Sequence, residues 1–315
     1  MDDTSFTDIV VATDGSDPAA AAVDAAIGLA AGTGATLHVC TVVNPFPTGQ
    51  SLTDLRKNRE EADERVESIV ARAEDAGVDA VATVREGMPA DELLAYVEEV
   101  GAEMVVIGTH GRGGARRVLL GSVAETVVRT ADVPVLVVHG DGVEVEWGSE
   151  SRFLLATDGS DAVTPAERIG VDLATTLGGR LTAVSAVDQA RALTNAGGGV
   201  LTNETIESVK RAVTNRATDA VDRALDRAEE AGVDADGEVI EGEPSRAICG
   251  YARDADADVV IVGTHGRTGV RRVVLGSVAE RILRAADRPV LVVPAAARSF
   301  AEAGAESDAD AESEK

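Results

Sequence analysis

The fold is decided by GTHGRGGARRVLLGSVAE at residues 108–125, which returns at residues 263–280 as GTHGRTGVRRVVLGSVAE with only three differences. A second motif, ATDGSD, precedes each copy without any change, at residues 12–17 and 156–161. Self-similarity of this kind indicates a repeated structural unit. The 315 residues therefore contain one domain and its duplicate.

Strand and helix patterns alternate within each copy. Short apolar runs that end in turns are typical of strands buried on both faces, and they are followed by helical segments. Such alternation predicts an α/β fold with a doubly wound parallel sheet and right-handed crossovers in each domain. In the first copy we expect strands at residues 8–13, 37–43, 81–87, 104–110 and 134–138, and helices at residues 18–31 and 52–76, from residue 89, and at residues 122–130.

The repeat also sets the domain boundaries. We expect the first domain at residues 1–140, a polar linker at 141–151, the second domain at 152–295 and a disordered acidic tail at 296–315. The second copy is longer between its second and third strands, with an extra glycine-rich stretch near residues 196–199. We expect Trp147, the only tryptophan, to pack against a domain face.

The charge balance narrows the class of protein. Acidic residues number 55 against 29 basic ones, for a net charge of −26. Molar salt shortens the Debye length to about 3 Å and screens such repulsion, so we expect a halophilic, salt-adapted protein. A basic surface for duplex nucleic acid is missing.

No apolar run approaches a membrane span and no signal peptide precedes the domain, so we expect a cytoplasmic location away from the membrane. Cys40 and Cys249 are expected to be reduced, buried thiols.

A glycine pattern follows the fourth strand of each copy: Gly-x2-Gly-x9-Gly-Ser. Glycines let the backbone approach a phosphate, and the N–H groups and dipole of the following helix then face the anion. We expect Ser122 and Ser277 at the helix N-cap, where the hydroxyl either caps the helix or binds a phosphate oxygen. The loop arginines favour an anionic ligand, although pairing with neighbouring acids would also explain them. These arginines are Arg112, Arg116, Arg117, Arg267, Arg271 and Arg272.

The Asp-Gly-Ser turn after the first strand supplies a carboxylate near the same loop. In a doubly wound sheet, ligands bind beyond the carboxyl ends of the strands where strand order reverses. Asp14 and Asp158 therefore either accept hydrogen bonds from a ribose or base, or cap the first helix. Neither the P-loop motif of NTPases nor the dinucleotide fingerprint of dehydrogenases occurs.

Both copies resemble universal stress protein domains, on the strength of the glycine pattern and the Asp-Gly-Ser turn. The resemblance implies Rossmann-like, five-stranded domains of the adenine nucleotide alpha hydrolase-like or flavodoxin-like type, with strand order 3-2-1-4-5. It also implies ATP or AMP as ligand, with Mg²⁺ as an optional companion. The first expected site comprises Thr13, Asp14, Val39, Gly108, His110, Gly111, Arg112, Gly121, Ser122 and Val123, and the second Thr157, Asp158, Ala183, Gly263, His265, Gly266, Arg267, Gly276, Ser277 and Val278.

The two sites are not expected to be equal. Ala183 replaces Val39 at the position that the resemblance sets against the adenine, and it offers less apolar contact. We therefore expect tighter binding in the first domain. The resemblance further implies that the two domains pair within one chain through their last strands, and a homodimer is the other arrangement it allows.

The leading hypothesis is a nucleotide-binding stress-response protein without efficient catalysis, whose occupancy biases conformation or assembly. A slow ATPase that acts as a timed switch is the alternative, with His110 and His265 as conceivable acid–base groups. A scaffold with vestigial sites is the third possibility. No nucleophile with an orienting partner and no metal-ligand spacing is evident in the sequence, so no catalytic or metal-binding residue is expected.

Overall fold

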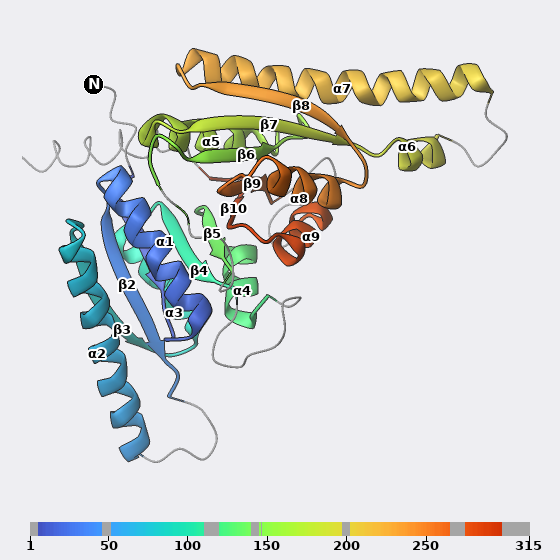
Figure 1. The fold of residues 1–315 in the computed structure, drawn as a ribbon. Coiled ribbons are helices and arrows are strands. Elements are labelled where there is room, and N and C mark those ends of the chain that lie inside the picture. Colours follow the sequence, from blue (N-terminus) through green and yellow to red (C-terminus); the bar gives the residue numbers. More distant parts are fainter. Residues whose placement is uncertain are drawn as a thin grey trace, which may run out of the picture. The chain divides into compact units, whose positions relative to one another are not determined.

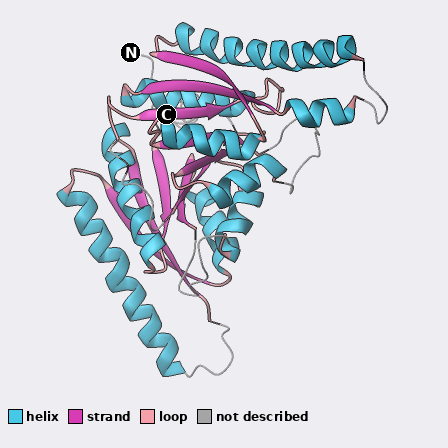
Figure 2. Ribbon diagram, turned by 45° about the vertical axis from the view of Figure 1, so that its right-hand side comes forward, coloured by secondary structure: helices cyan, strands magenta, loops and turns pink. Residues whose placement is uncertain are grey.

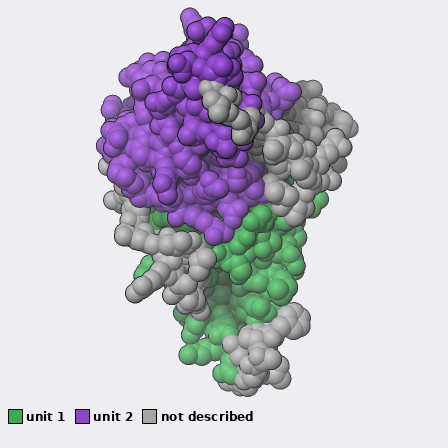
Figure 3. All heavy atoms as spheres, turned by 90° about the vertical axis from the view of Figure 1, so that its right-hand side faces the viewer, with its two compact units in different colours: residues 1–148, 296–315 green, residues 149–295 purple. Residues whose placement is uncertain are grey.

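A computed structural model of the chain describes residues 6–45, 52–109, 120–139, 145, 147–196, 202–264 and 275–297. The described residues form two compact units that meet in sequence between Gly148 and Ser149 (Figure 3). Unit 1 runs up to Gly148, and unit 2 is Ser149–Ala295.

Unit 1 has the alternating elements that the sequence predicts, with boundaries that differ by at most two residues. Its strands lie in the order β3-β2-β1-β4-β5 and its neighbouring pairs are parallel, which confirms the predicted topology (Figure 1). The elements are β1 (Asp8–Ala12), α1 (Asp17–Thr33), β2 (Thr36–Val43), α2 (Leu52–Asp75), β3 (Ala80–Glu86), α3 (Pro89–Val100), β4 (Met104–Gly108), α4 (Ser122–Thr130) and β5 (Val135–Val138).

Unit 2 repeats this plan, with strand order β8-β7-β6-β9-β10. The one addition among the described residues is the short helix α6, which lies between the second and third strands and contacts α7. The extra length predicted there thus contributes a helix as well as a glycine stretch. The elements are β6 (Arg152–Ala156), α5 (Thr164–Leu177), β7 (Arg180–Val187), α6 (Gln189–Asn195), α7 (Asn203–Glu230), β8 (Ala235–Glu241), α8 (Pro244–Asp254), β9 (Val259–Gly263), α9 (Ser277–Ala285) and β10 (Val290–Val293).

Helices cover both faces of the sheet in each unit (Figure 2). Right-handed crossovers place α1 and α2 on one face of unit 1 and α3 and α4, which contact each other, on the opposite face. In unit 2, α5 contacts α7 on one face and α8 contacts α9 on the other. The central strands are therefore buried on both sides, and Ile9, Val10 and Val11 of β1 have 0% exposure.

Three residues that the sequence singles out pack against or within the two units. Trp147 packs on α1 of unit 1, where a Cβ added to Gly28 would lie 2.6 Å from Trp147 Cδ1. Cys40 and Cys249 are free and buried, as predicted.

Among the described residues, none of the helices is both long enough and apolar enough to cross a membrane.

Candidate functional site

The carboxyl ends of β1 and β4 form the switch point of unit 1, because the chain crosses toward β2 and β3 after β1 and toward β5 after β4. The two strands pair directly, with Val11 opposite Val106. Two segments follow these ends: the Thr-Asp-Gly-Ser turn after β1, and the glycine loop after β4. The fold therefore brings the two sequence motifs to the same edge of the sheet. Unit 2 repeats this at β6 and β9, where Leu155 pairs with Ile261.

The turn after β1 is fixed by its own side chains. Asp14 Oδ1 accepts hydrogen bonds from Ser16 N at 3.0 Å and from Ser16 Oγ at 2.6 Å. The amide of Gly15 donates to Thr13 Oγ1 at 3.3 Å, and Gly15 has a φ of +79°. The carboxylate thus stabilises the turn before α1, where Ser16 is the N-cap residue.

Unit 2 reproduces this turn almost atom for atom. Asp158 Oδ1 accepts from Ser160 N at 3.0 Å and from Ser160 Oγ at 2.6 Å. Gly159 has a φ of +65°, and its amide donates to Thr157 Oγ1 at 3.1 Å. In both turns, therefore, one oxygen of the aspartate carboxylate accepts hydrogen bonds from the serine two residues later. The sequence predicted helix capping as the local role of the two aspartates, but the N-cap residues are Ser16 in α1 and Val163 in α5, and each aspartate bonds the serine of its own turn instead.

The glycine loop begins at the last residue of β4. A Cβ on Gly108 would lie 2.5 Å from the carbonyl oxygen of Pro18 and 2.8 Å from Ala19 N, so only glycine fits where β4 passes the start of α1. The matching Gly263 is less confined, because its nearest neighbours would lie 3.5 Å from an added Cβ. Close packing therefore explains the first glycine of the pattern in unit 1 and not in unit 2.

The two ends of the loop are joined by one backbone hydrogen bond in each unit. Gly121 N donates to the carbonyl oxygen of Thr109 at 2.6 Å, and Gly276 N donates to that of Thr264 at 2.6 Å. Both threonines are buried, with 4% and 7% exposure. This bond brings the start of the helix back to the end of the strand.

Helices α4 and α9 begin at these loop ends. The N-cap residues are Gly121 and Gly276, so the predicted N-cap position of Ser122 and Ser277 is wrong by one residue. Each serine occupies the first helical position, is exposed, and its hydroxyl makes no hydrogen bond to another described residue. A glycine N-cap lacks a capping side chain, so the first N–H groups of the helix keep their affinity for an anion.

The two positions that the resemblance sets against an adenine are fully buried within the sheet. Val39 and Ala183 both have 0% exposure, and each pairs on both sides within its sheet, with Val39 between Val11 and Ala82. Val123 and Val278, which follow the first helical serines in sequence, are half-buried. Six predicted site residues lie outside the described part of the chain, namely His110, Gly111, Arg112, His265, Gly266 and Arg267.

Comparison with known families shows which family the chain belongs to. The sequence model of the Universal stress protein family matches residues 5–139 and again residues 151–294. The chain belongs to the universal stress protein family. A universal stress protein of Mycolicibacterium smegmatis is 30% identical over 264 residues, which cover 82% of this chain and 85% of that protein.

Two further relatives show the extent of the similarity. A universal stress protein of Mycobacterium tuberculosis is 32% identical over 191 residues, so the chain spans 61% of that protein's length with 61% of its own. The crystal structure of a universal stress protein from Archaeoglobus fulgidus matches with a TM-score of 0.67 and 20% identity, covering 91% of this chain and 98% of that one. At that identity the match supports the fold alone.

Two buried ionisable side chains of this universal stress protein, His38 and Cys40, lie in β2 beside β1. His38 in β2 contacts Asp8 Oδ1 through Nε2 at 2.7 Å and Tyr96 Oη through Nδ1 at 3.0 Å, in keeping with a structural role. Burial raises the pKa of the Cys40 thiol to about 12, which removes its thiolate at neutral pH. In the described ranges no group of three or more His, Cys, Asp or Glu side chains is arranged to hold a metal ion.

Sequence reasoning missed the residues that support the turns. Arg65 of α2 and Arg223 of α7 lie against the turn glycines. Glu167 of α5 has 4% exposure and accepts a hydrogen bond from Thr157 Oγ1 at 2.7 Å. The buried glutamate could have been noticed, because it stands at a position of an otherwise apolar helix face where unit 1 has Val23. The arginines could not, because they occupy different positions of the two helices.

Proposed function

We propose that this universal stress protein binds ATP or AMP at one site in each unit, and that occupancy biases its conformation or assembly in a stress response. One observation carries the proposal: in both units the Thr-Asp-Gly-Ser turn and an uncapped helix N-terminus meet at the switch point of a parallel sheet. The shared hydrogen bonds within the two turns, and the shared loop closure at Thr109 and Thr264, support one function for both.

The chemistry of the site supports a nucleotide. The N–H groups at the start of α4 and α9 favour a phosphate, and the exposed hydroxyls of Ser122 and Ser277 are available as donors beside them. Asp14 and Asp158 add an acceptor for a ribose hydroxyl at the neighbouring strand end. Mg²⁺ would enter with the phosphates, because it keeps most of its water and needs few protein carboxylates.

The first test is whether the protein carries a nucleotide when it is purified without one. Supernatant from heated protein is analysed by anion-exchange chromatography, and we expect ATP or AMP near two equivalents per chain at saturation. Calorimetric titration with ATP in molar KCl then gives the affinity. If heating releases no nucleotide and calorimetry detects no ATP binding, the protein would instead be a scaffold with vestigial sites.

Matched variants assign the two sites. Gly121→Asp and Gly276→Asp each put a carboxylate at the N-cap beside the proposed phosphate, and we expect each to abolish one site. Ala20→Asp, at an exposed position of α1, adds the same charge elsewhere. Gly276→Asp leaves the site of unit 1, and Gly121→Asp leaves the site of unit 2. We expect the first variant to bind ATP more tightly than the second.

We propose that hydrolysis is slow at most, and the same preparations test this. Single-turnover hydrolysis is compared between the wild type and the double variant His110→Ala/His265→Ala. Rapid turnover that depends on these histidines would replace a binding protein with a timed ATPase switch.

We also propose that the two units pair through their last strands. Val135–Val138 and Val290–Val293 are apolar four-residue strands, each at the end of the strand order of its own unit. An apolar edge strand requires cover. Residues 1–148 and 149–315, expressed separately and mixed, should form a one-to-one complex in size-exclusion chromatography, whereas two non-interacting monomers would argue against pairing.

A further inference from the structure

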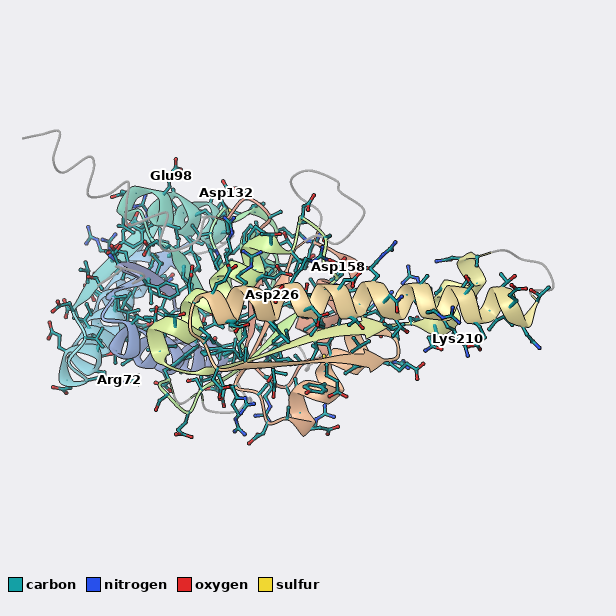
Figure 4. All side chains as sticks on the ribbon, turned by 90° about the horizontal axis from the view of Figure 1, so that it is seen from above. Arg72, Glu98, Asp132, Asp158, Lys210 and Asp226 are labelled. Carbon is teal, nitrogen blue, oxygen red and sulfur yellow. The ribbon has the colours of Figure 1, made fainter. Side chains whose placement is uncertain are left out.

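The long helix on one face of each unit brings an arginine to the Thr-Asp-Gly-Ser turn. In unit 2, Arg223 Nη2 of α7 donates a hydrogen bond to the carbonyl oxygen of Gly159 at 3.0 Å. Asp158 of the same turn lies beside α7 (Figure 4). In unit 1, Arg65 of α2 lies over Gly15, so that a Cβ on this glycine would be 2.5 Å from Arg65 Nε.

The two arginines are not equivalent in sequence. The last turn of each helix and the residues that follow it are nearly identical, with RAEDAGVDA at residues 72–80 and RAEEAGVDA at residues 227–235. This similarity sets the alignment of α2 with α7. In this alignment Arg65 corresponds to Ala220, and Arg223 corresponds to Ser68. The arginine has thus moved by three residues, and residues three apart lie on the same helix face. A guanidinium is kept at the turn although the helix position that supplies it differs.

The retained feature is therefore the charge at the turn and not a particular helix residue. Both turns have a glycine in the left-handed region, with φ of +79° at Gly15 and +65° at Gly159. Inside each turn the aspartate accepts two hydrogen bonds from the following serine. The arginine approaches the glycine from the side of the helix.

We propose that Arg65 and Arg223 are positioning residues for the two nucleotide sites, holding the turns so that Asp14 and Asp158 keep the orientation in which they receive the ligand. This inference rests on the proposed nucleotide-binding function. The arginines act through the turn and need no contact with the nucleotide.

Unit 2 reinforces its turn at a second point. Gly159 N donates to Thr157 Oγ1, whose hydroxyl donates to Glu167 Oε1 at 2.7 Å. Arg227 of α7 lies 3.6 Å from Glu167 Oε2 and completes the connection to the helix. Unit 1 has Val23 in place of this glutamate and lacks the connection. Loss of the arginine is consequently expected to affect unit 1 more than unit 2.

The experiment measures ATP binding by the full chain in molar KCl, in a Gly276→Asp background that leaves only the site of unit 1. We expect Arg65→Ala to raise Kd about tenfold, because the turn loses the guanidinium that lies over Gly15. Arg65→Ala/Ser68→Arg rebuilds the arrangement of α7 and should restore Kd to within about twofold. Arg56→Ala removes an exposed arginine of the same helix and serves as the control.

Hydrogen exchange in the unliganded protein gives a second readout. The amides of Gly15 and Ser16 both donate within the turn, so their exchange should accelerate in Arg65→Ala and recover in the relocated-arginine variant. Kd and exchange unchanged in Arg65→Ala, or no recovery on adding Ser68→Arg, would overturn the positioning role. A wild-type protein that binds no ATP would instead refute the proposed function itself.

Discussion

Alanine at the first glycine of the Gly-x2-Gly-x9-Gly-Ser pattern should destabilise unit 1 and leave the stability of unit 2 almost unchanged. At Gly108 the added methyl group would meet the backbone of Pro18 and Ala19 at 2.5 to 2.8 Å, well inside normal contact. Backbone at a strand–helix junction cannot move aside cheaply, so we expect overpacking to cost about 2 kcal/mol. For a domain of this size that lowers Tm by about 4–8 °C.

The same substitution at Gly263 meets nothing closer than 3.5 Å. Its backbone φ is not in the left-handed region, so alanine is allowed there, and we expect a change within about 1 kcal/mol. Gly263→Ala therefore separates packing from ligand binding. If this glycine lets the backbone approach a phosphate, the variant should keep its stability and lose about tenfold in ATP affinity at the site of unit 2.

The assay uses the only tryptophan, Trp147, which packs on α1 and so reports the unfolding of unit 1. Urea titrations followed by its fluorescence should shift for Gly108→Ala and not for Gly263→Ala, while calorimetry follows both units. Gly250→Ala, inside α8 with open space around it, is the control and should stabilise by about 0.5–1 kcal/mol. Equal shifts for the two loop glycines would refute the packing argument.

Three further predictions follow from charge and burial. Because the net charge is −26, Tm should rise with KCl most steeply below about 1 M, where the Debye length falls from about 10 to 3 Å; choline chloride should act alike, and an equal gain from sucrose would point away from screening. Partial burial raises the pKa of Glu243, but hydrogen bonds from Ser245 Oγ, the Arg246 amide and Arg281 outweigh it and leave the pKa below its ordinary value. This carboxylate therefore stabilises unit 2 above about pH 4.3, and the stability is lost as pH falls through the lower folded pKa. In urea titrations from about pH 5 to pH 3, the difference in free energy of unfolding between the wild type and Glu243→Met should shrink. A difference that stays constant with pH would contradict this. Burial raises the pKa of the Cys40 thiol to about 12 and that of Cys249 to about 11, so a thiol reagent at pH 8 should label neither until urea is added, and fast labelling of the native protein would count against their burial.

The duplicated motifs predict most of the fold because local and global preferences agree there. Short apolar strands, glycines after helices and right-handed crossovers predict a doubly wound parallel sheet, and the resemblance to universal stress protein domains adds the strand order 3-2-1-4-5. Of the proposed site residues, the turn and loop residues that the structure describes do lie at the ends of adjacent strands. The predicted N-cap at Ser122 was wrong by one residue, because glycine can occupy an N-cap with its backbone alone.

The sequence by itself determined that the protein is a duplicated α/β domain with two copies of a glycine-loop pattern. Hydrophobic periodicity and repeated motifs involve residues that are close together in the chain, so they can be recognised from the sequence alone. Only the tertiary structure decided what neighbours each motif has. Identical glycines at positions 108 and 263 differ in confinement, and non-equivalent arginines at 65 and 223 reach the same turn. These differences arise from how helices pack across the sheet, which depends on side chains far away in the chain.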